Sequence, residues 1–276
     1  MKNNNKFRLD VWGAITLGTI ALYALFLLYP MAYLIRQSVL DPDTGGFTLA
    51  YFTKFFSKSY YFDTLINSFK VSITATVLSI AIGTPLAYLF TIFKIKGKSV
   101  LNILIVVASM SAPFIGAYSW ILLLGRSGVI TAFFKNLGIA IPDIYGFGGI
   151  VLVMTLQLFP LVFLYAKGAL KNIDNSLIEA AENLGCSGIA CFFKVVVPLI
   201  MPTLLAAALL VFMRSFADFG TPVLIGEGYR TFPVVLYTEF INEVGGSDGF
   251  AAAIAVIAIV VTTLVFLVQK IGRAHV

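Results

Sequence analysis

Six long apolar stretches constrain the fold of this sequence more than any other feature. A helix needs roughly 20 residues to cross about 30 Å of hydrocarbon, because each residue adds about 1.5 Å. The stretch from Phe250 to Gln269 has this length and contains no charged side chain. We therefore expect an all-α bundle with about six transmembrane spans. The predicted spans are Val11–Ile35, Val71–Phe93, Val100–Leu124, Gly148–Leu170, Leu199–Phe216 and Phe250–Gln269.

The composition excludes several other classes of protein. Hydrophobic residues make up 59% of the 276 residues and charged residues 12%, whereas soluble domains carry about 25% charged residues. A soluble enzyme, a disordered protein and a disulfide-rich secreted protein are thereby excluded. The net charge of +6 is spread in small basic groups along the chain. Because no basic stripe or nucleic-acid-binding motif is present, we expect the lipid bilayer and not nucleic acid as the surroundings.

The basic residues also predict the orientation of the spans. The first apolar stretch follows three basic residues but is too long for a signal peptide, so we interpret it as a retained span. Lys94, Lys96 and Lys98 fall within five residues between the second and third spans, a density typical of cytoplasmic loops. With six spans, both termini are then expected on the cytoplasmic side of a bacterial inner membrane.

The connection over residues 171–198 carries a helical pattern of its own. Ser176 with Glu179 three residues later predicts a helix start with a capping box. Gly185 predicts a left-handed C-terminal cap, and Ser187 can start a second helix that runs toward Pro198. The first helix would have one apolar face, formed by Leu177, Ala180, Ala181 and Leu184.

The spacing within this connection resembles the EAA loop of ATP-binding-cassette importer permeases. The family pattern is Glu-Ala-Ala, three residues, Gly, nine residues and Ile-x-Leu-Pro, and two valines replace Ile and Leu in this sequence. The matching residues are Glu179, Ala180, Ala181, Gly185, Val195, Val197 and Pro198. The resemblance implies that residues 1–270 form a permease domain and that the loop docks onto a separate ATPase subunit. It further implies an extracytoplasmic solute-binding protein and a second permease copy or a fused second half as partners.

Arg214 and Asp218 are the candidate residues of the substrate pathway. A charge at the bilayer centre costs roughly 2.5–3.5 kcal/mol on insertion scales, so intramembrane charge favours a functional interpretation. The two residues are four apart, so on a continuous helix they would share a face and could pair. The alternative is an interfacial ion pair that ends the fifth span.

The stretch 215–226 points to a cargo through a second resemblance. It is similar to the corresponding stretch of ferric-iron importer permeases, which implies ferric iron as the substrate. Polyamine, thiamine and aminophosphonate permeases have similar stretches and remain alternatives. A secondary transporter or channel is an alternative of a different class, which would need buried ionisable relays or interrupted spans.

The sequence offers no catalytic, cofactor or metal site, so we do not expect an enzyme. The triplet Gly97-Lys98-Ser99 lacks the glycine that a phosphate loop needs at position 92, which is Ile. The sole histidine is His275. Cys186 and Cys191 are expected to be packing residues, because cytosolic thiols stay reduced and two thiols alone are a poor zinc site. ATP hydrolysis is expected on a separate subunit.

A separate expectation concerns the last six residues, 271–276. They back-translate to a common sequencing adapter, so we expect them to be non-native and the natural chain to continue.

Overall fold

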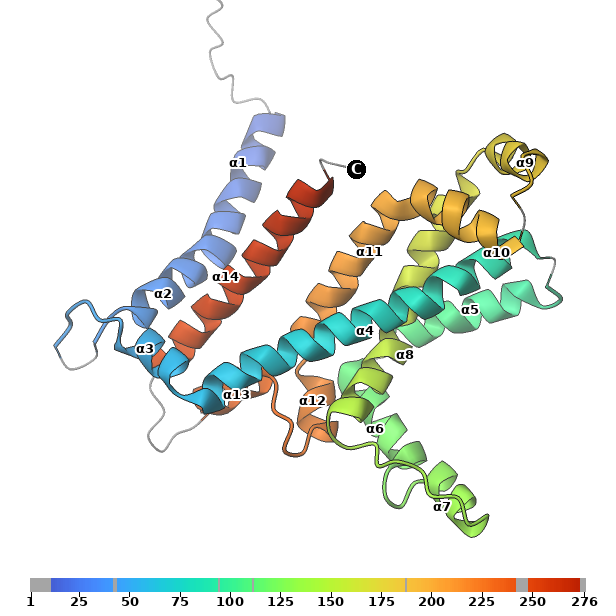
Figure 1. The fold of residues 1–276 in the computed structure, drawn as a ribbon. Coiled ribbons are helices and arrows are strands. Elements are labelled where there is room, and N and C mark those ends of the chain that lie inside the picture. Colours follow the sequence, from blue (N-terminus) through green and yellow to red (C-terminus); the bar gives the residue numbers. More distant parts are fainter. Residues whose placement is uncertain are drawn as a thin grey trace, which may run out of the picture. The chain divides into compact units, whose positions relative to one another are not determined.

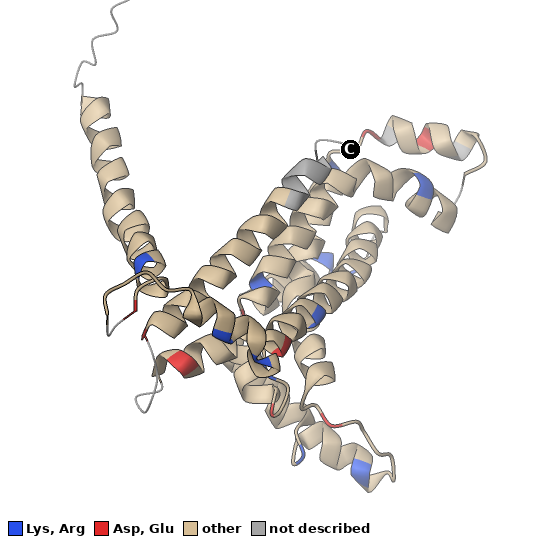
Figure 2. Cartoon of the chain, turned by 60° about the vertical axis from the view of Figure 1, so that its left-hand side comes forward, with Lys and Arg blue, Asp and Glu red and all other residues tan. Residues whose placement is uncertain are grey.

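The structure, a computed structural model, describes residues 11–41, 44–93, 95–110, 112–186, 188–241 and 248–273. Within these ranges every named element is a helix (Figure 1), which confirms the all-α prediction. Six stretches are long and apolar enough to cross a membrane, and long parts of them carry no charge (Figure 2). These stretches are Val11–Ser38, Ser59–Ile92, Pro113–Asn136, Phe147–Lys171, Gly188–Phe216 and Asp248–Leu267.

The chain forms two compact units. The smaller unit comprises residues 1–58 and 236–261, and the larger one residues 59–235 and 262–276. Helices of the smaller unit are α1 (Val11–Tyr23), α2 (Tyr29–Ser38) and α3 (Ala50–Ser57), while α13 (Phe232–Ile241) and α14 (Asp248–Arg273) contribute residues to both units. Within the smaller unit, the Lys54 ammonium lies 3.9 Å from the centre of the Phe250 ring. This contact joins α3 to the start of α14.

Two prolines each follow a short π-helical turn. The turn Ala24–Leu28 comes before Pro30 in the first span, and the turn Phe192–Val196 comes before Pro198. Proline has no N–H and its ring crowds the preceding turn, so a wider turn lets the helix continue. The first predicted span is therefore confirmed as one helical stretch that contains a local irregularity.

The core of the larger unit lies between α4 (Ser59–Ile92), α8 (Phe147–Lys171) and α11 (Val197–Phe216). Gly83 of α4 lies directly against α8, because a Cβ atom at this position would be 2.8 Å from Cβ of Val162. Other small side chains of α4, including Ser72 and Ser79, are buried as well. In a membrane no hydrophobic force drives helices together. Small residues stabilise such a contact because they let the two helix backbones approach closely.

Four predicted spans agree with the structure apart from their ends. The stretches Val71–Phe93, Gly148–Leu170, Leu199–Phe216 and Phe250–Gln269 correspond to α4, α8, α11 and α14. The α4 helix begins at Ser59 instead of Val71, because backbone hydrogen bonding continues beyond the most apolar part of the sequence. The helix that contains the fifth span begins at Gly188.

The prediction of a continuous third span over Val100–Leu124 is wrong. The helix α5 (Lys98–Ser109) ends inside the predicted span, and a separate helix, α6 (Pro113–Leu124), begins after an interruption. Ala112 is extended, with φ −67° and ψ 142°, as expected for a residue that precedes a proline. The apolar stretch of this region is instead Pro113–Asn136, which combines α6 with α7 (Val129–Asn136).

Some predictions concern residues outside the described ranges. They include the basic residues before Val11, the helix start at Ser187 and His275. The described part of α14 reaches Arg273, and residues 274–276 of the expected non-native tail lie beyond it.

Candidate functional site

The helix predicted in the connection after α8 is present as α9 (Asn175–Asn183), but its cap differs from the prediction. The carboxylate of Asp174 accepts a hydrogen bond of 3.0 Å from the backbone N–H of Ser176. Hydrogen bonds from Ser176 lower the pKa of Asp174 below its ordinary value. Because Ser176 already lies inside α9, the predicted capping box of Ser176 with Glu179 is wrong. Aspartate is as good an N-cap as serine, and Asp174 offers its carboxylate two positions earlier.

The C-terminal end of α9 forms the predicted left-handed cap. Gly185 has φ +85°, and the N–H of Cys186 donates a 3.0 Å hydrogen bond to the carbonyl of Ala181. This bonding is the Schellman pattern, in which a left-handed glycine ends the helix. Gly188, with φ +57°, begins the next helix, α10 (Gly188–Cys191). Left-handed glycines thus lie at the end of α9 and at the start of α10.

The region around α9 presents large apolar side chains to its surroundings. Leu184 is 88% exposed and Ile189 78%, and Leu177 and Phe193 are also exposed. Ala180 and Glu179 lie exposed among them. We call this set of six residues the α9 surface. Exposed apolar side chains on a connection between spans are available to a partner protein or to the lipid headgroups.

The two valines of the predicted docking set lie in a different environment. Val195 and Val197 are half-buried, and Val197 packs against the core of the larger unit. Ala181 is also half-buried, whereas Pro198 is exposed. Val197 therefore holds the start of α11 against the core, while the α9 surface remains accessible.

One helical stretch joins this region to a cavity. It runs from Gly188 to Phe216 through α10, the π-helical turn and α11, and its 29 residues measure about 43 Å at 1.5 Å each. Figure 1 shows that α11 leads from α10 to the neighbourhood of α12 (Gly220–Ile225). A displacement at α10 can thus reach the far end of α11 through a continuous helix.

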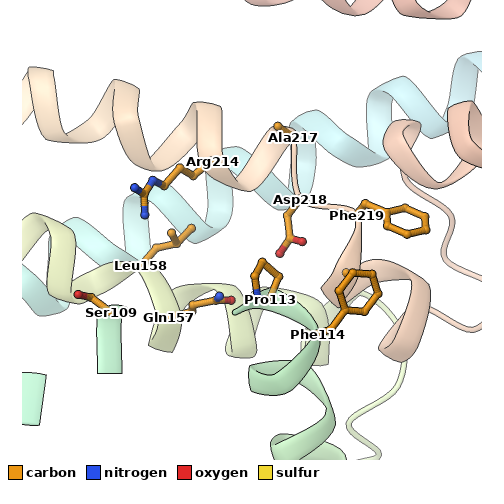
Figure 3. A pocket seen from close by; sticks show the side chains of 10 residues that line it. Ser109, Pro113, Phe114, Gln157, Leu158, Arg214, Ala217, Asp218 and Phe219 are labelled. Atoms are coloured by element: carbon orange, nitrogen blue, oxygen red, sulfur yellow. The ribbon is translucent and has the colours of Figure 1, made fainter. Parts of the chain in front are cut away.

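The cavity at that far end has a volume of about 470 Å³. It is lined by the ends of α5 and α6, by the middle of α8 and by the connection from α11 to α12 (Figure 3). Its lining residues are Ser109, Pro113, Phe114, Gln157, Leu158, Arg214, Ala217, Asp218, Phe219 and Gly220. Non-helical backbone at membrane depth is tolerated where it lines such a cavity, and the interruption between α5 and α6 lies here.

Both predicted pathway residues line this cavity, but the predicted pairing between them is wrong. Within the described residues, Arg214 forms no ion pair with Asp218 or with another carboxylate. Asp218 lies beyond the end of α11, and its carboxylate accepts hydrogen bonds from the hydroxyl (2.7 Å) and the N–H (3.3 Å) of Thr221. The helix ends at Phe216, so the four-residue spacing no longer places the two side chains on one face. Figure 3 shows them directed into separate parts of the cavity.

The electrostatics of the cavity are set by these two residues. Burial raises the pKa of Asp218 above its ordinary value, and the hydrogen bonds from Thr221 act in the opposite direction. Arg214 is exposed to the cavity. In the part of the chain that the structure describes, no group of three His, Cys, Asp or Glu side chains is placed to hold a metal ion.

Sequence reasoning missed several residues of the cavity wall. Gln157 comes from the middle of an apolar span, and Gly220 lies where a Cβ would be 3.1 Å from Cβ of Pro113. Pro113, inside an apolar stretch, was the available signal for the interruption. The available signal for Gln157 was its polar side chain in the middle of an apolar span, because polar side chains in spans face the protein interior or a cavity.

A cluster around Arg126 ties three connections of the larger unit together. Its guanidinium lies 3.0 Å from the carboxylate of Asp143 and 2.9 Å from that of Glu227, and it covers the ring of Tyr145 at 4.7 Å. Arg126 follows α6, Asp143 precedes α8 and Glu227 follows α12. The helix α12 begins at the cavity and ends beside this cluster, which therefore ties its C-terminal end to the loops that contain Arg126 and Asp143.

Comparisons with solved structures agree with this arrangement of helices. The chain superposes on a chain of a bacterial transporter that imports the acidic polysaccharide alginate, with a TM-score of 0.78, 16% identity and 96% of each chain covered. A chain of the MetNI methionine transporter gives a TM-score of 0.60, at 14% identity over 77% of this chain and 94% of that one. At these identities the likeness concerns the fold.

Sequence comparisons find permeases of several transport systems. The chain is 27% identical to a putative ferric transport system permease protein of Haemophilus influenzae, over 91% of this chain and 40% of that protein. It is also 27% identical to the ferric transport system permease protein of Actinobacillus pleuropneumoniae, over 98% of this chain and 38% of that protein. It therefore spans about two fifths of the length of these two relatives. A spermidine/putrescine permease of Haemophilus influenzae is 27% identical over 98% of this chain and 96% of its own length.

The family match covers most of the chain, from residue 44 to residue 274. It includes α9, the cavity and the helix that joins them. Together with the six apolar helices, it confirms the resemblance found in the sequence. The chain belongs to the family of binding-protein-dependent transport system inner membrane components, and its six apolar helices are those of a multi-pass membrane protein.

Proposed function

We propose that this chain is the permease of an importer driven by ATP hydrolysis on separate ATP-binding-cassette subunits. The observation that carries the proposal is the continuous helical stretch Gly188–Phe216. It has the exposed α9 surface at one end and the cavity with Arg214 at the other. A partner that moves α9 would act on the cavity through this helix.

The α9 surface has the properties of a docking site for a folded partner. Leu177 and Leu184 supply apolar contact area, Ala180 permits close approach, and Glu179 can pair with a basic group. The left-handed cap at Gly185 keeps α9 at a defined angle to α10. When ATP closes the partner subunits, the displacement of α9 opens the bundle toward the outside, and hydrolysis returns it to the inward-facing state.

The substrate pathway passes the cavity near Arg214 and Asp218. In this proposal the pathway is completed by a second copy of the permease or by a second homologous half. The ferric relatives, which are longer than this chain by more than a factor of two, agree with a paired arrangement. Both termini and the α9 surface lie on the cytoplasmic side, as the basic residues predict.

Ferric iron is the proposed cargo, delivered by an extracytoplasmic solute-binding protein. The similarity of residues 215–226 to ferric-iron permeases and the two ferric relatives support it. Other relatives are permeases of spermidine/putrescine and molybdenum transport systems, so these two cargoes are the ones to compare with ferric iron. The outer loops joined by Arg126 are the proposed contact for the binding protein.

The test is transport by the full chain in proteoliposomes, with and without candidate ATPase and solute-binding-protein subunits. Radioactive ferric iron is the first cargo, and spermidine and molybdate are the comparison. The double variant Glu179→Lys with Gly185→Pro should lose ATPase binding and uptake while it remains inserted. The matched control Lys135→Gln changes a charge on α7, outside the α9 surface, and should retain both.

Two results would contradict the proposal. Uptake by the permease without nucleotide would indicate a channel or a secondary transporter. Labelling of Cys186, which follows α9, by a membrane-impermeant thiol reagent added to intact cells would show that this region faces outward. The orientation would then be the opposite of the proposed one. Uptake of spermidine or molybdate without iron would replace the cargo and leave the transport class unchanged.

A further inference from the structure

A second cavity lies where three helices of the larger unit end. It has a volume of about 370 Å³ and is bounded by the C-terminal end of α4, the N-terminal end of α5 and the C-terminal end of α8. The lining residues are Phe90, Thr91, Lys98, Ser99, Asn102, Lys167 and Lys171. The helix α9 begins four residues after Lys171, so this cavity and α9 lie at the same end of α8.

Three lysines line this cavity without a compensating carboxylate. Among the described residues that bound it, none is Asp or Glu, and none of the three lysines takes part in an ion pair. The polar groups that accompany them are the hydroxyl of Ser99, the amide of Asn102 and the hydroxyl of Thr91, which itself donates a 2.8 Å hydrogen bond to the carbonyl of Ala87. We call this set of seven lining residues the lysine pocket. Three cations in one small cavity repel one another, and a bound anion would relieve that repulsion.

One of the lysines is held inside the pocket. The Lys167 ammonium donates to the side-chain oxygen of Asn102, and it lies 5.3 Å from the centre of the Phe163 ring. A lysine that only anchors a span extends its ammonium outward to the headgroups. Lys167 instead lies one helical turn inside the end of α8, half-buried against α5. Its placement orients a positive charge toward the space between the helices.

We propose that the lysine pocket binds a phosphate group. Lysine ammonium groups and hydroxyl donors are the groups that proteins use to bind phosphate. Basic pockets between transmembrane helices on the cytoplasmic side bind anionic lipid headgroups. An anionic lipid of the inner leaflet and a soluble phosphate compound present the same chemistry to these residues. The site is separate from the α9 surface and from the cavity of the proposed pathway, and it does not depend on the nature of the cargo.

A carboxylate of a partner ATPase is the competing occupant. The pocket is partly open, since Ser99 and Lys171 are exposed, and an exposed lysine could also meet a carboxylate of a partner. The half-buried position of Lys167 favours a small anion that can enter between the helices. The experiment therefore treats loss of ATPase binding as a separate readout.

The full chain is purified in a neutral detergent and its binding is measured with two probes. Native mass spectrometry counts bound phosphatidylglycerol, with phosphatidylcholine as the neutral comparison, and calorimetry measures inorganic phosphate. The variant Lys167→Gln with Lys171→Gln should weaken binding of whichever probe the unchanged chain binds. The expected loss is about 25-fold, or about fivefold per lysine, which corresponds to about 1 kcal/mol for each lysine. The control Lys70→Gln with Lys135→Gln removes two exposed lysines from outside the pocket and should bind as the unchanged chain does.

The variant Lys167→Arg with Lys171→Arg retains the charge and should restore most of the binding. If the glutamine double variant does not fold, Lys98→Gln, at the edge of the pocket, replaces it with an expected loss of about fivefold. Weaker binding of phosphatidylglycerol by the glutamine variant identifies a lipid as the source of the phosphate group. Weaker binding of inorganic phosphate by that variant identifies a soluble compound as the source. Unchanged binding of both probes overturns the proposal, and so does a loss of ATPase binding without a change for either probe.

Discussion

The hydroxyl of Thr221 donates a 2.7 Å hydrogen bond to the carboxylate of Asp218, which secures the start of α12 at the cavity wall. Asp218 is thereby engaged within the protein, and Arg214 retains an exposed guanidinium that no described carboxylate neutralises. The two charged residues of the cavity therefore have separable roles. Asp218 shapes the wall, and Arg214 presents a charge to whatever enters.

Substitution at Thr221 and at Arg214 should separate these roles. Thr221→Val removes a buried hydrogen bond to a charged group and should cost about 1.5–3 kcal/mol of stability, measured by thermal unfolding in detergent. Thr221→Ser retains the hydroxyl and serves as the control. Arg214→Gln should leave unfolding unchanged and reduce uptake in proteoliposomes. A destabilised Arg214→Gln variant would show that Arg214 has a structural partner after all.

Gly83 should tolerate no larger side chain. Its Cβ position is 2.8 Å from Cβ of Val162 and 2.9 Å from the carbonyl oxygen of Phe159, so Gly83→Leu forces α4 away from α8. Overpacking of this kind costs typically about 1–3 kcal/mol. The expected result is a lower midpoint of thermal unfolding in detergent. Gly148→Ala, at a helical glycine with open space around it, is the control and should unfold at the original temperature or above.

The turn after α9 depends on backbone conformation and not on space. Gly185 has φ +85°, and a Cβ atom at this position would have no neighbouring atom within 4 Å, so only the left-handed conformation disfavours other residues. Gly185→Val should reduce ATPase-coupled uptake because it disturbs the angle between α9 and α10. Asparagine adopts this conformation more readily, so Gly185→Asn should retain more uptake than Gly185→Val. Equal uptake by both variants would show that the angle does not matter for coupling.

The start of α9 should loosen in acid. The hydrogen bonds from Ser176 lower the pKa of Asp174 below its ordinary value of 3.8. The ionised carboxylate therefore stabilises α9 fully above the ordinary pKa, and the effect is lost as the pH falls through the lowered folded-state pKa. Hydrogen exchange of the first α9 amides, corrected for intrinsic rates, should show this loss in the unchanged chain. Asp174→Ala should exchange rapidly at every pH, and a persistent pH dependence in that variant would assign the effect to another group.

Arg126 should matter for delivery of cargo more than for stability. Its ion pairs with Asp143 and Glu227 are exposed, and exposed pairs contribute little to folding. Arg126→Gln should release the loops and weaken stimulation of uptake by the binding protein, with thermal unfolding nearly unchanged. Lys135→Gln, on neighbouring α7, controls for the change in surface charge. Full stimulation in the Arg126→Gln variant would remove these loops from the proposed contact.

Features that depend on a local pattern could be predicted from consecutive residues alone. The charge-free stretch from Phe250 to Gln269 predicted α14 because the length and hydropathy of a span are properties of one segment. Gly185 predicted the end of α9 for a similar reason, since the left-handed cap involves only its neighbours. The EAA spacing pointed to the family, because twenty consecutive positions carried it.

Features that depend on residues far apart in the chain arose only when the helices packed. The interruption before Pro113 is tolerated because α8, α11 and the start of α12 surround it with protein. The separation of Arg214 from Asp218 follows from the end of α11 at Phe216, which helical periodicity did not predict. Lys98, Lys167 and Lys171 meet only because α5 and α8 pack together. Hydropathy and periodicity reflect what one segment prefers, whereas a cavity exists only after several segments have come together.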